Sequence, residues 1–135
     1  MRNYWDSSAV LNALAARSVA DRLDAGEHLT RSHAYVEAFS HLSGKGLPLK
    51  GGGRQRVTAE DAAQMIESLA ALEVRDLSQP ETMAALKEAQ RFGVQGARIH
   101  DFIHARAAKF GGADRILTRD NGFAAIADGI QCEWP

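Results

Sequence analysis

The amino-acid sequence predicts an α/β fold: a three-layer α/β/α sandwich with a mostly parallel sheet, in a single domain over residues 1–135. Strand-like segments alternate with helical segments along the chain, and parallel neighbouring strands need a crossover that a helix supplies. The length suits one compact domain with its own core. Hydrophobic residues make up 45% and charged residues 24%, the balance of a globular protein.

The first half of the chain predicts strands and helices separated by capping residues and glycines. Ser43 to Val57 is rich in glycine and basic residues, which predicts a mobile surface loop. The elements expected before it are a strand at 2–5, a helix after the capping residues 6–8, a short helix at 18–23 ended by Gly26, a strand at 28–30, and a helix that Ser32 caps and that buries Tyr35, Val36 and Phe39.

The second half predicts a similar alternation. The expected elements are a helix from Thr58 through Leu69, a strand at 73–77, a helix from Ser78 to Gly93, a helix at 97–110 ended by Gly111, a strand at 115–118, a short helix at 121–127 and a strand at 129–133. In parallel sheets of this kind, functional sites gather at the carboxyl ends of the strands.

Composition excludes several classes of protein. The net charge of -1 gives no overall attraction to nucleic acid, so phosphate binding would need local basic clusters or bound cations. Cys132, the only cysteine, can form neither an internal disulfide nor a cysteine pair for zinc, which favours a reducing cytosol. No membrane-length apolar run or leader-like start is present. We therefore expect a cytoplasmic protein without a membrane partner.

Four carboxylates are candidates for a common site. Asp6 and Asp120 each follow a short apolar strand and should lie at the same rim of the sheet, whereas Glu37 and Asp101 lie inside helices. If the four converge, their mutual repulsion calls for a divalent cation. Oxygen ligands favour Mg²⁺ or Mn²⁺, and such an ion can activate water against a phosphodiester. The sequence therefore predicts a phosphate-ester hydrolase.

A simpler interpretation of the same acids stays open. A single aspartate after a strand is more often a helix cap than a metal ligand. The chain has 17 acidic residues, so chance placement is easy. The spacing by itself does not decide between caps and ligands.

The chain as a whole, over residues 2–134, resembles the PIN-domain ribonucleases, and among them the toxins of VapBC-type toxin-antitoxin pairs. The residues that carry the resemblance occur in the family's order and spacing. They are Tyr4-Trp5-Asp6-Ser7-Ser8, then Thr30 with Ser32 and Glu37, then Ile99-His100-Asp101, and finally Thr118-Arg119-Asp120-Asn121-Gly122-Phe123.

The resemblance implies a PIN fold, an RNA substrate, a cognate antitoxin protein that covers the active-site groove, and a homodimer. It assigns metal binding to four acids, which are Asp6, Glu37, Asp101 and Asp120. It also implies that Thr118 orients water or phosphate, and that Asn121 extends the hydrogen bonding of the pocket. Gly122 departs from the pattern of many relatives, which have a further acid at this position, and this departure puts a second metal ion in doubt.

Basic and aromatic residues elsewhere allow both functional and structural interpretations. Arg119 either meets a phosphate or, as we expect, pairs with an acid at the rim, and His100 and His104 are expected to be structural or surface histidines. Trp5 and Trp134 are expected to pack against the fold or an interface. Four residues of the Gly-rich loop either contact RNA phosphates or are simply solvated: Lys45, Lys50, Arg54 and Arg56.

Three functions are consistent with these observations. The first is a Mg²⁺- or Mn²⁺-dependent endoribonuclease that acts as a toxin. The second is a catalytically inactive PIN-fold binding module, and the third is a housekeeping PIN nuclease without an antitoxin. RNA cleavage that a chelator abolishes separates the first from the second, and a short partner gene next to this one separates the first from the third.

Overall fold

A computed structural model of the chain describes residues 1–16, 23, 26–49, 51–69 and 71–134. Five strands form one sheet in the order β5-β2-β1-β6-β7. Every pairing between neighbours in this sheet is parallel, which confirms the predicted α/β class. The strands are β1 (Arg2–Trp5), β2 (Glu27–Thr30), β5 (Glu73–Val74), β6 (Arg115–Leu117) and β7 (Gln131–Glu133).

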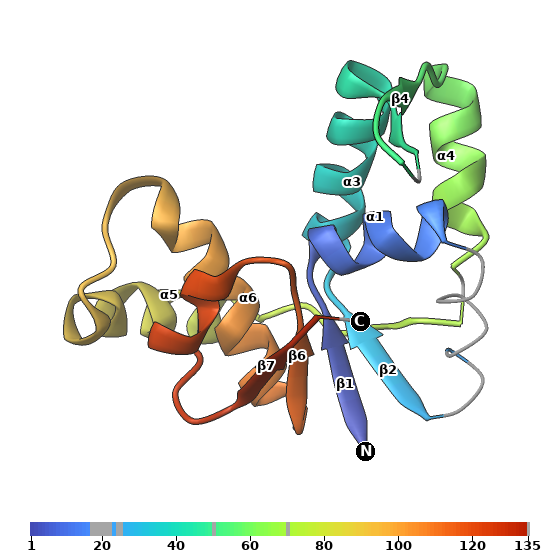
Figure 1. Cartoon of the computed structure of the whole chain (residues 1–135). Coiled ribbons are helices and arrows are strands. Elements are labelled where there is room, and N and C mark those ends of the chain that lie inside the picture. Colours follow the sequence, from blue (N-terminus) through green and yellow to red (C-terminus); the bar gives the residue numbers. More distant parts are fainter. Residues whose placement is uncertain (17–22, 24–25, 50, 70, 135) are drawn as a thin grey trace.

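Helices connect the strands of this sheet. The α-helices are α1 (Ser7–Ala15), α3 (Ser32–Lys45), α4 (Ala59–Glu67), α5 (Gln79–Glu88) and α6 (Ile99–Phe110). Short 3-10 turns are η2 (Ala89–Phe92), η3 (Gly96–Arg98) and η4 (Asn121–Ala125). In Figure 1, α1, α3 and α4 lie together beyond the upper ends of β1 and β2, and α5 and α6 lie on the side of β6 and β7. None of the helices in the described part of the chain has the length and apolar character that crossing a membrane requires.

The central strand β1 sends consecutive side chains to opposite faces of the sheet. Trp5 packs in a cluster with residues of α1 and α3, among them Val10 and Ala38. Tyr4 packs in a second cluster with residues of α6, among them Ala105 and Ala108. Successive strand residues point to opposite faces of the sheet, so these two clusters lie on opposite faces. Helices therefore cover the sheet on both sides. This arrangement agrees with the predicted α/β/α layering.

Side-chain caps confirm three of the predicted helix starts. The Asp6 carboxylate accepts from the backbone N–H of Ala9 at the start of α1, and Thr58 accepts from that of Asp61 at the start of α4. Ser78 forms a complete capping box with Glu81 at the start of α5. Such caps satisfy backbone N–H groups that have no partner within the helix.

The prediction that Ser32 caps α3 is wrong. Arg31 occupies the cap position and makes no side-chain cap bond, while Ser32 is the first residue of the helix. Both the backbone N–H and the hydroxyl of Ser32 donate to Asp76, which follows β5. The helix start is therefore capped from a distant segment, because β5 lies next to β2 in the sheet.

The predicted buried face of α3 is also wrong. Ala34, Ala38 and Leu42 are fully buried, whereas Val36 is 59% exposed. The buried positions recur every four residues, as on one side of a helix, but the small alanines that mark them carry little hydrophobicity. Close packing of α3 against α1 and α4 favours these small side chains over the larger ones beside them.

The segment predicted to be a mobile loop contains the end of a helix and a short β-hairpin. α3 continues through Gly44 to Lys45, and β3 (Leu47–Pro48) then pairs antiparallel with β4 (Arg54–Gln55). Gly46 has a φ of 93°, and an added Cβ there would lie 2.5 Å from the carbonyl oxygen of Gln55. Only glycine permits this close return of the chain to the end of α3. Lys50 lies outside the described residues.

The remaining elements differ from the prediction mainly at their ends. β5 ends at Val74 and not at Leu77, and the helix expected to reach Gly93 stops at Glu88 and continues as η2. The helix expected from Ala97 begins as η3 and becomes α-helical at Ile99. The last predicted helix is the 3-10 turn η4. The short helix predicted at 18–23 lies, apart from Leu23, outside the described residues.

Candidate functional site

Asp6 and Thr118 lie side by side because adjacent strands end together. Trp5 of β1 pairs with Leu117 of β6, so the next residue of each chain segment leaves the sheet at the same rim. The backbone N–H of Asp6 donates to the carbonyl oxygen of Leu117 over 3.3 Å. This placement confirms that the residues after the two strands share one rim.

The Asp6 carboxylate is held by three donors. Thr118 Oγ1 donates to Oδ2 over 2.5 Å, and Ser8 Oγ donates to Oδ1 over 2.6 Å. The Ala9 N–H also donates to Oδ1, over 2.9 Å. Thr118 Oγ1 in turn accepts from the Asp120 N–H over 3.0 Å, so one hydroxyl links the two aspartates of the rim.

Burial governs the ionisation of Asp6. The residue is only 5% exposed, and desolvation raises the pKa of its carboxyl above the ordinary value of 3.8. The hydrogen bonds from Ser8, Thr118 and Ala9 act in the opposite direction and offset only part of this rise. An ionised Asp6 is therefore costly to keep here, and a nearby cation would stabilise it.

Glu37 reaches the same region from α3 and is held by a buried histidine of α6. His104 Nε2 lies 2.7 Å from Glu37 Oε1, and the Tyr4 hydroxyl lies 2.7 Å from His104 Nδ1. Burial by itself would raise the pKa of Glu37, but the hydrogen bond and charge of His104 outweigh burial, with a further contribution from His33, and lower it below 4.5. Because the ionised Glu37 carboxylate can only accept, the Nε2–H of His104 is the donor of this hydrogen bond.

Asp101 and Asp120 meet across a guanidinium. Arg98 Nη1 lies 3.4 Å from Asp101 Oδ2 and 3.5 Å from Asp120 Oδ2. Burial raises the pKa of Asp101, and the negative charge of Asp120 raises it further, although Arg98 acts against both. The Gly122 N–H donates to the other oxygen of Asp120 over 2.8 Å. The two carboxylates are therefore close enough to repel each other.

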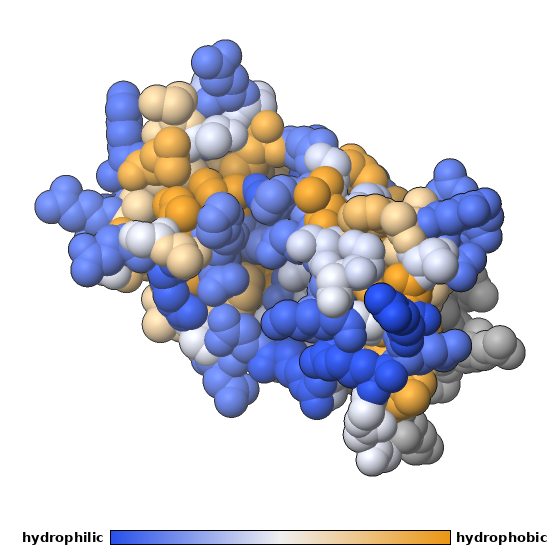
Figure 2. Space-filling model, turned by 90° about the horizontal axis from the view of Figure 1, so that it is seen from above, coloured by the Kyte–Doolittle hydropathy of each residue, from blue (hydrophilic) through white to orange (hydrophobic). Residues whose placement is uncertain are grey.

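The structure thus brings all four predicted acids to one region at the carboxyl ends of β1 and β6. Thr118 joins Asp6 to Asp120, and Arg98 joins Asp120 to Asp101. The charge of His104 acts on Asp6, Glu37 and Asp101. Figure 2 looks onto this end of the molecule and shows hydrophilic side chains across its middle, with hydrophobic areas on both sides. Asn121 is exposed beside Asp120 in a hollow that Thr118 also lines.

The donor set has the chemistry that a hard divalent cation prefers, namely carboxylate oxygens with a hydroxyl beside them. Within the described residues, no three acid, histidine or cysteine side chains stand in an arrangement that would hold a metal ion as they are. The carboxylate oxygens instead accept hydrogen bonds from protein groups, above all from Thr118, His104 and Arg98.

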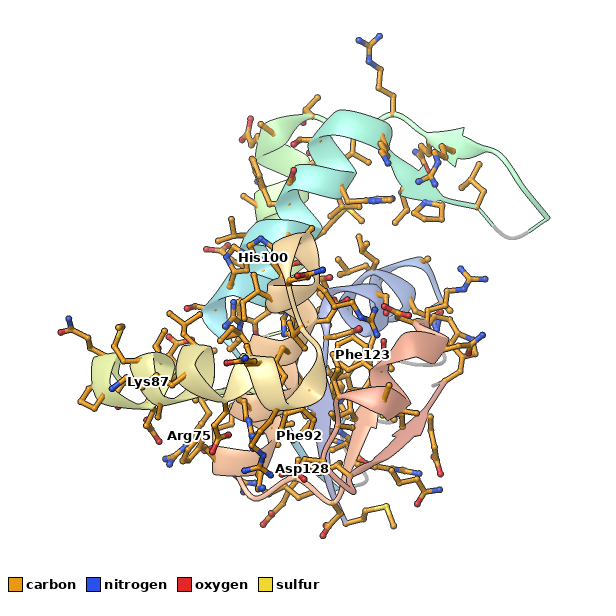
Figure 3. The ribbon with its side chains drawn as sticks, turned by 90° about the vertical axis from the view of Figure 1, so that its left-hand side faces the viewer. Arg75, Lys87, Phe92, His100, Phe123 and Asp128 are labelled. Atoms are coloured by element: carbon orange, nitrogen blue, oxygen red, sulfur yellow. The ribbon has the colours of Figure 1, made fainter. Side chains whose placement is uncertain are left out.

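The two histidines of α6 have different environments. His104 is 2% exposed and belongs to the site, whereas His100 is exposed and stacks on His33 of α3 with ring centroids 6.0 Å apart. Figure 3 shows His100 at the end of α6 beside α3, with Phe92 and Asp128 near the opposite end. Both histidines therefore agree with the expectation of structural or surface roles, but His104 also positions a candidate ligand.

A basic and aromatic surface adjoins the acids. The guanidinium of Arg119 lies over the Trp134 ring, 4.9 Å from its centroid, and Trp134 is 46% exposed. The expected pairing of Arg119 with a rim acid is therefore replaced by this stacking. Both residues line the hollow at Asp120, and both line a second hollow with Arg54 and His41. Trp5 is buried in the core, as expected.

Comparison with known proteins adds no family assignment. No protein-family model matches the chain, and no curated protein matches it significantly. The candidate site consequently stands on its own geometry and on the sequence resemblance.

Sequence reasoning missed the residues that hold the acids in place. Tyr4, Ser8 and His104 are hydrogen-bonded around Asp6 and Glu37, and Arg98 lies between the other two acids. The four-residue spacing of His100 and His104 was a signal, but it did not indicate which histidine faces the sheet. Tyr4 appeared only as part of the first motif of the resemblance and Arg98 carried no signal, because the roles of both depend on partners far away in the chain.

Proposed function

We propose that this protein is a Mg²⁺- or Mn²⁺-dependent endoribonuclease with a PIN-like fold. The observation that carries the proposal is the convergence of four carboxylates, from four separate segments, at the carboxyl rim of a parallel sheet. Clustered acids oppose folding unless something positive neutralises them, so such a cluster is explained better by a function than by stability. The ordered motifs of the sequence resemblance support the same activity.

Asp6, Glu37, Asp101 and Asp120 would hold the divalent ion. When bound, such an ion neutralises charge on phosphoryl oxygens and makes an attacking water more acidic. Thr118 and Ser8 hold the Asp6 carboxylate in a single orientation through hydrogen bonds of 2.5 and 2.6 Å. His104 does the same for Glu37, and its Tyr4 partner fixes the orientation of the ring.

The surface beside the acids favours a single-stranded nucleic acid as substrate. Arg119 and Arg54 line adjoining hollows and can neutralise successive phosphates. Trp134 is exposed enough to stack on a base, and its ring already carries the Arg119 guanidinium. Unpaired bases stack on aromatic side chains in this way in single-stranded RNA recognition. The surface leads from the acids toward the hairpin of β3 and β4.

The test compares purified wild-type protein with Asp6→Asn and with Asp61→Asn, a matched change of an exposed aspartate on α4. We expect wild type and Asp61→Asn to cleave labelled single-stranded RNA in the presence of Mn²⁺, and EDTA to abolish the cleavage. Asp6→Asn should lose at least 100-fold in rate, the order of effect for a group that stabilises the transition state. Expression in cells should arrest growth with wild type but not with Asp6→Asn.

Cleavage by Asp6→Asn at the wild-type rate would show that this cluster of acids is not the catalytic site. Binding of RNA and Mn²⁺ without cleavage would instead support a PIN-fold binding module, and cleavage of DNA alone would indicate a different nuclease. The toxin role, the antitoxin partner and the homodimer are further proposals that rest on the resemblance. Co-expression with the product of any short adjoining gene should relieve growth arrest if that product is the antitoxin.

A further inference from the structure

A hollow beside the acids is lined by two arginines and a tryptophan. Its volume is about 240 Å³, and its walls come from α1, the end of α3, the β3–β4 hairpin and the segments that follow β6 and β7. One face of α1 lines it, because the α1 residues concerned recur at the three- and four-residue spacing of a helix face. The lining side chains that carry polar or aromatic chemistry are Ser8, Asn12, His41, Arg54, Arg119 and Trp134.

The hollow is positively charged. None of the described residues that line it is a carboxylate, and within the described part of the chain neither Arg54 nor Arg119 forms an ion pair. Four other arginines do pair with acids, namely Arg2, Arg98, Arg106 and Arg115. Two guanidiniums without a counter-charge favour an anionic ligand, and their planar donors match the oxygens of a phosphate.

Uncharged groups orient both guanidiniums. Arg54 Nη1 lies 2.7 Å from His41 Nε2, and because a guanidinium can only donate, His41 accepts through an unprotonated nitrogen. Burial lowers the pKa of His41, and the charges of Arg54 and Lys45 lower it further, so the ring is neutral at neutral pH. Arg119 is held over the Trp134 ring instead. Each arginine therefore has a partner that leaves its charge available to a ligand.

Trp134 adds a flat apolar surface to this cationic hollow. The Arg119 guanidinium lies over one face of the ring, yet the side chain is still 46% exposed, which leaves indole surface for a second flat group. Bases of single-stranded nucleic acids stack on such side chains. Asn12 lines the same hollow and makes no side-chain hydrogen bond to the described residues, so its amide can donate to and accept from the edge of a base.

We propose that this hollow binds one nucleotide of an RNA strand, with its phosphate at Arg54 and Arg119 and its base on Trp134. The charge selects an anion, and the indole selects an anion that carries a flat ring. The volume lies below the about 300 Å³ at which pockets for drug-sized ligands begin, which limits the occupant to a single nucleotide unit.

Ser8 connects the hollow to the acids. Its hydroxyl donates to Asp6 Oδ1 over 2.6 Å and accepts from the backbone N–H of Arg119 over 2.9 Å. A nucleotide in the hollow therefore lies next to the candidate catalytic rim. As a subsite for the substrate, the hollow rests on the proposed function. Binding of the nucleotide itself needs neither the acids nor a metal ion.

The experiment measures binding of labelled AMP by equilibrium dialysis in EDTA, which removes any contribution of metal ions. Adenosine, inorganic phosphate and a short single-stranded RNA serve as competitors. Adenosine and phosphate should each compete at least about 10-fold less well than AMP, because only AMP engages both the ring and the guanidiniums. The RNA should displace AMP. Phosphate that competes as well as AMP would overturn the proposal, because it would indicate a plain anion site such as an acidic protein segment uses.

Variants of the hollow test its two halves separately. Trp134→Leu should bind AMP about 10-fold more weakly, the order of effect for the loss of one stacked base, whereas Trp134→Phe should keep most of the affinity. Arg54→Gln should also weaken AMP, because one of the two charges is lost. Arg75→Gln, a matched change of an exposed arginine outside the hollow, should bind as wild type. An AMP affinity unchanged in either Trp134→Leu or Arg54→Gln would overturn the proposal.

These outcomes separate the nucleotide site from the proposed function. If wild type cleaves RNA in a chelator-sensitive way but AMP binding ignores Trp134 and Arg54, the nucleotide site fails and the nuclease proposal stands. If AMP binds through both side chains but wild type cleaves no RNA, the nuclease proposal fails and the nucleotide site stands.

Discussion

Asp6 and Glu37 face the same region but ionise differently because their partners differ. Asp6 is buried among hydroxyl and amide donors, and no cation among the described residues forms an ion pair with it. Burial raises the pKa of its carboxyl. Glu37 is also partly buried, yet the imidazole of His104 reverses the effect of burial and lowers its pKa. The metal-free protein therefore carries one acid that opposes folding when charged and one that supports it.

Replacing Asp6 should stabilise the metal-free protein. The folded-state pKa of Asp6 is raised, so its protonated form supports folding, and this contribution is lost as pH rises through the folded pKa. Asp6→Asn in EDTA should therefore need more urea to unfold than wild type at neutral pH. The difference should shrink as pH falls toward the ordinary value of 3.8. A destabilised Asp6→Asn variant at neutral pH would contradict this prediction.

Replacing Glu37 should have the opposite effect. Its folded-state pKa is depressed, so the stability it contributes is present above the ordinary value of 4.5 and is lost as pH falls through the folded pKa. Glu37→Gln keeps an acceptor for His104 but loses the charge, and should cost about 1 kcal/mol at neutral pH. Urea unfolding across a pH series checks both sign and size. A loss that persists unchanged in acid would point to packing instead of charge.

At the scale of elements, α3 depends on a residue outside its own segment. Asp76 accepts from the backbone N–H and the hydroxyl of Ser32, which ties the start of α3 to the chain after β5. Helix starts usually take their caps from the residue just before them, which here is Arg31. The position of Glu37, five residues beyond Ser32 at the helix start, therefore depends indirectly on Asp76.

Asp76→Ala should destabilise the protein by about 1 kcal/mol, the usual cost of a lost helix cap. Asp76→Asn should cost less, because its side chain retains an acceptor for the Ser32 N–H. Urea unfolding of the two variants measures the difference. Equal stability of Asp76→Ala and wild type would show that solvent satisfies the start of α3 equally well.

The β3–β4 hairpin presents Arg54 beside the hollow that Arg119 and Trp134 also line. If RNA crosses this surface, Arg54→Gln should weaken binding of single strands of any sequence. The slope of log K against log salt concentration should decrease in magnitude by about 0.7, the value for one phosphate contact on a single strand. Filter binding by the Asp6→Asn variant over a salt series avoids cleavage. An unchanged slope would show that Arg54 does not contact an RNA phosphate.

At the scale of the whole molecule, the parallel sheet collects residues that are far apart in the chain. Thr118 and Asp6 are separated by most of the chain but leave adjacent strands at one rim. α3 and α6 add one acid each from elements that pack on the two faces of the sheet. A ligand that binds at this rim therefore contacts both layers of helices at once.

Divalent ions should consequently stabilise the entire fold. A ligand that binds only the folded state at 100 times its dissociation constant adds about 2.7 kcal/mol to stability. Wild type should melt at a higher temperature with Mn²⁺ than with EDTA, and Asp101→Asn should lose most of that gain. Asp61→Asn should behave as wild type. Equal gains in all three proteins would place the ion elsewhere.

The sequence alone was sufficient to predict the α/β class, most strand and helix positions and the shared rim of Asp6 and the residues after β6. These features depend on local patterns, because strand and helix periodicities, caps and glycine stops act between residues close in the chain. The buried face of α3 was predicted wrongly, because alanines such as Ala34 and Ala38 are weak hydrophobic markers and only packing against neighbouring helices selects them.

Tertiary structure alone decided how the acids are held. Whether a carboxylate receives a hydroxyl, an imidazole or a guanidinium depends on which distant side chains share its space, as with His104 at Glu37 and Arg98 at Asp120. Solvent exposure, and with it the direction of each pKa shift, is likewise a property of the packed molecule. Local sequence does not contain the hydrogen-bonding partners of a carboxylate or its solvent exposure, since both arise only when separate segments are brought together.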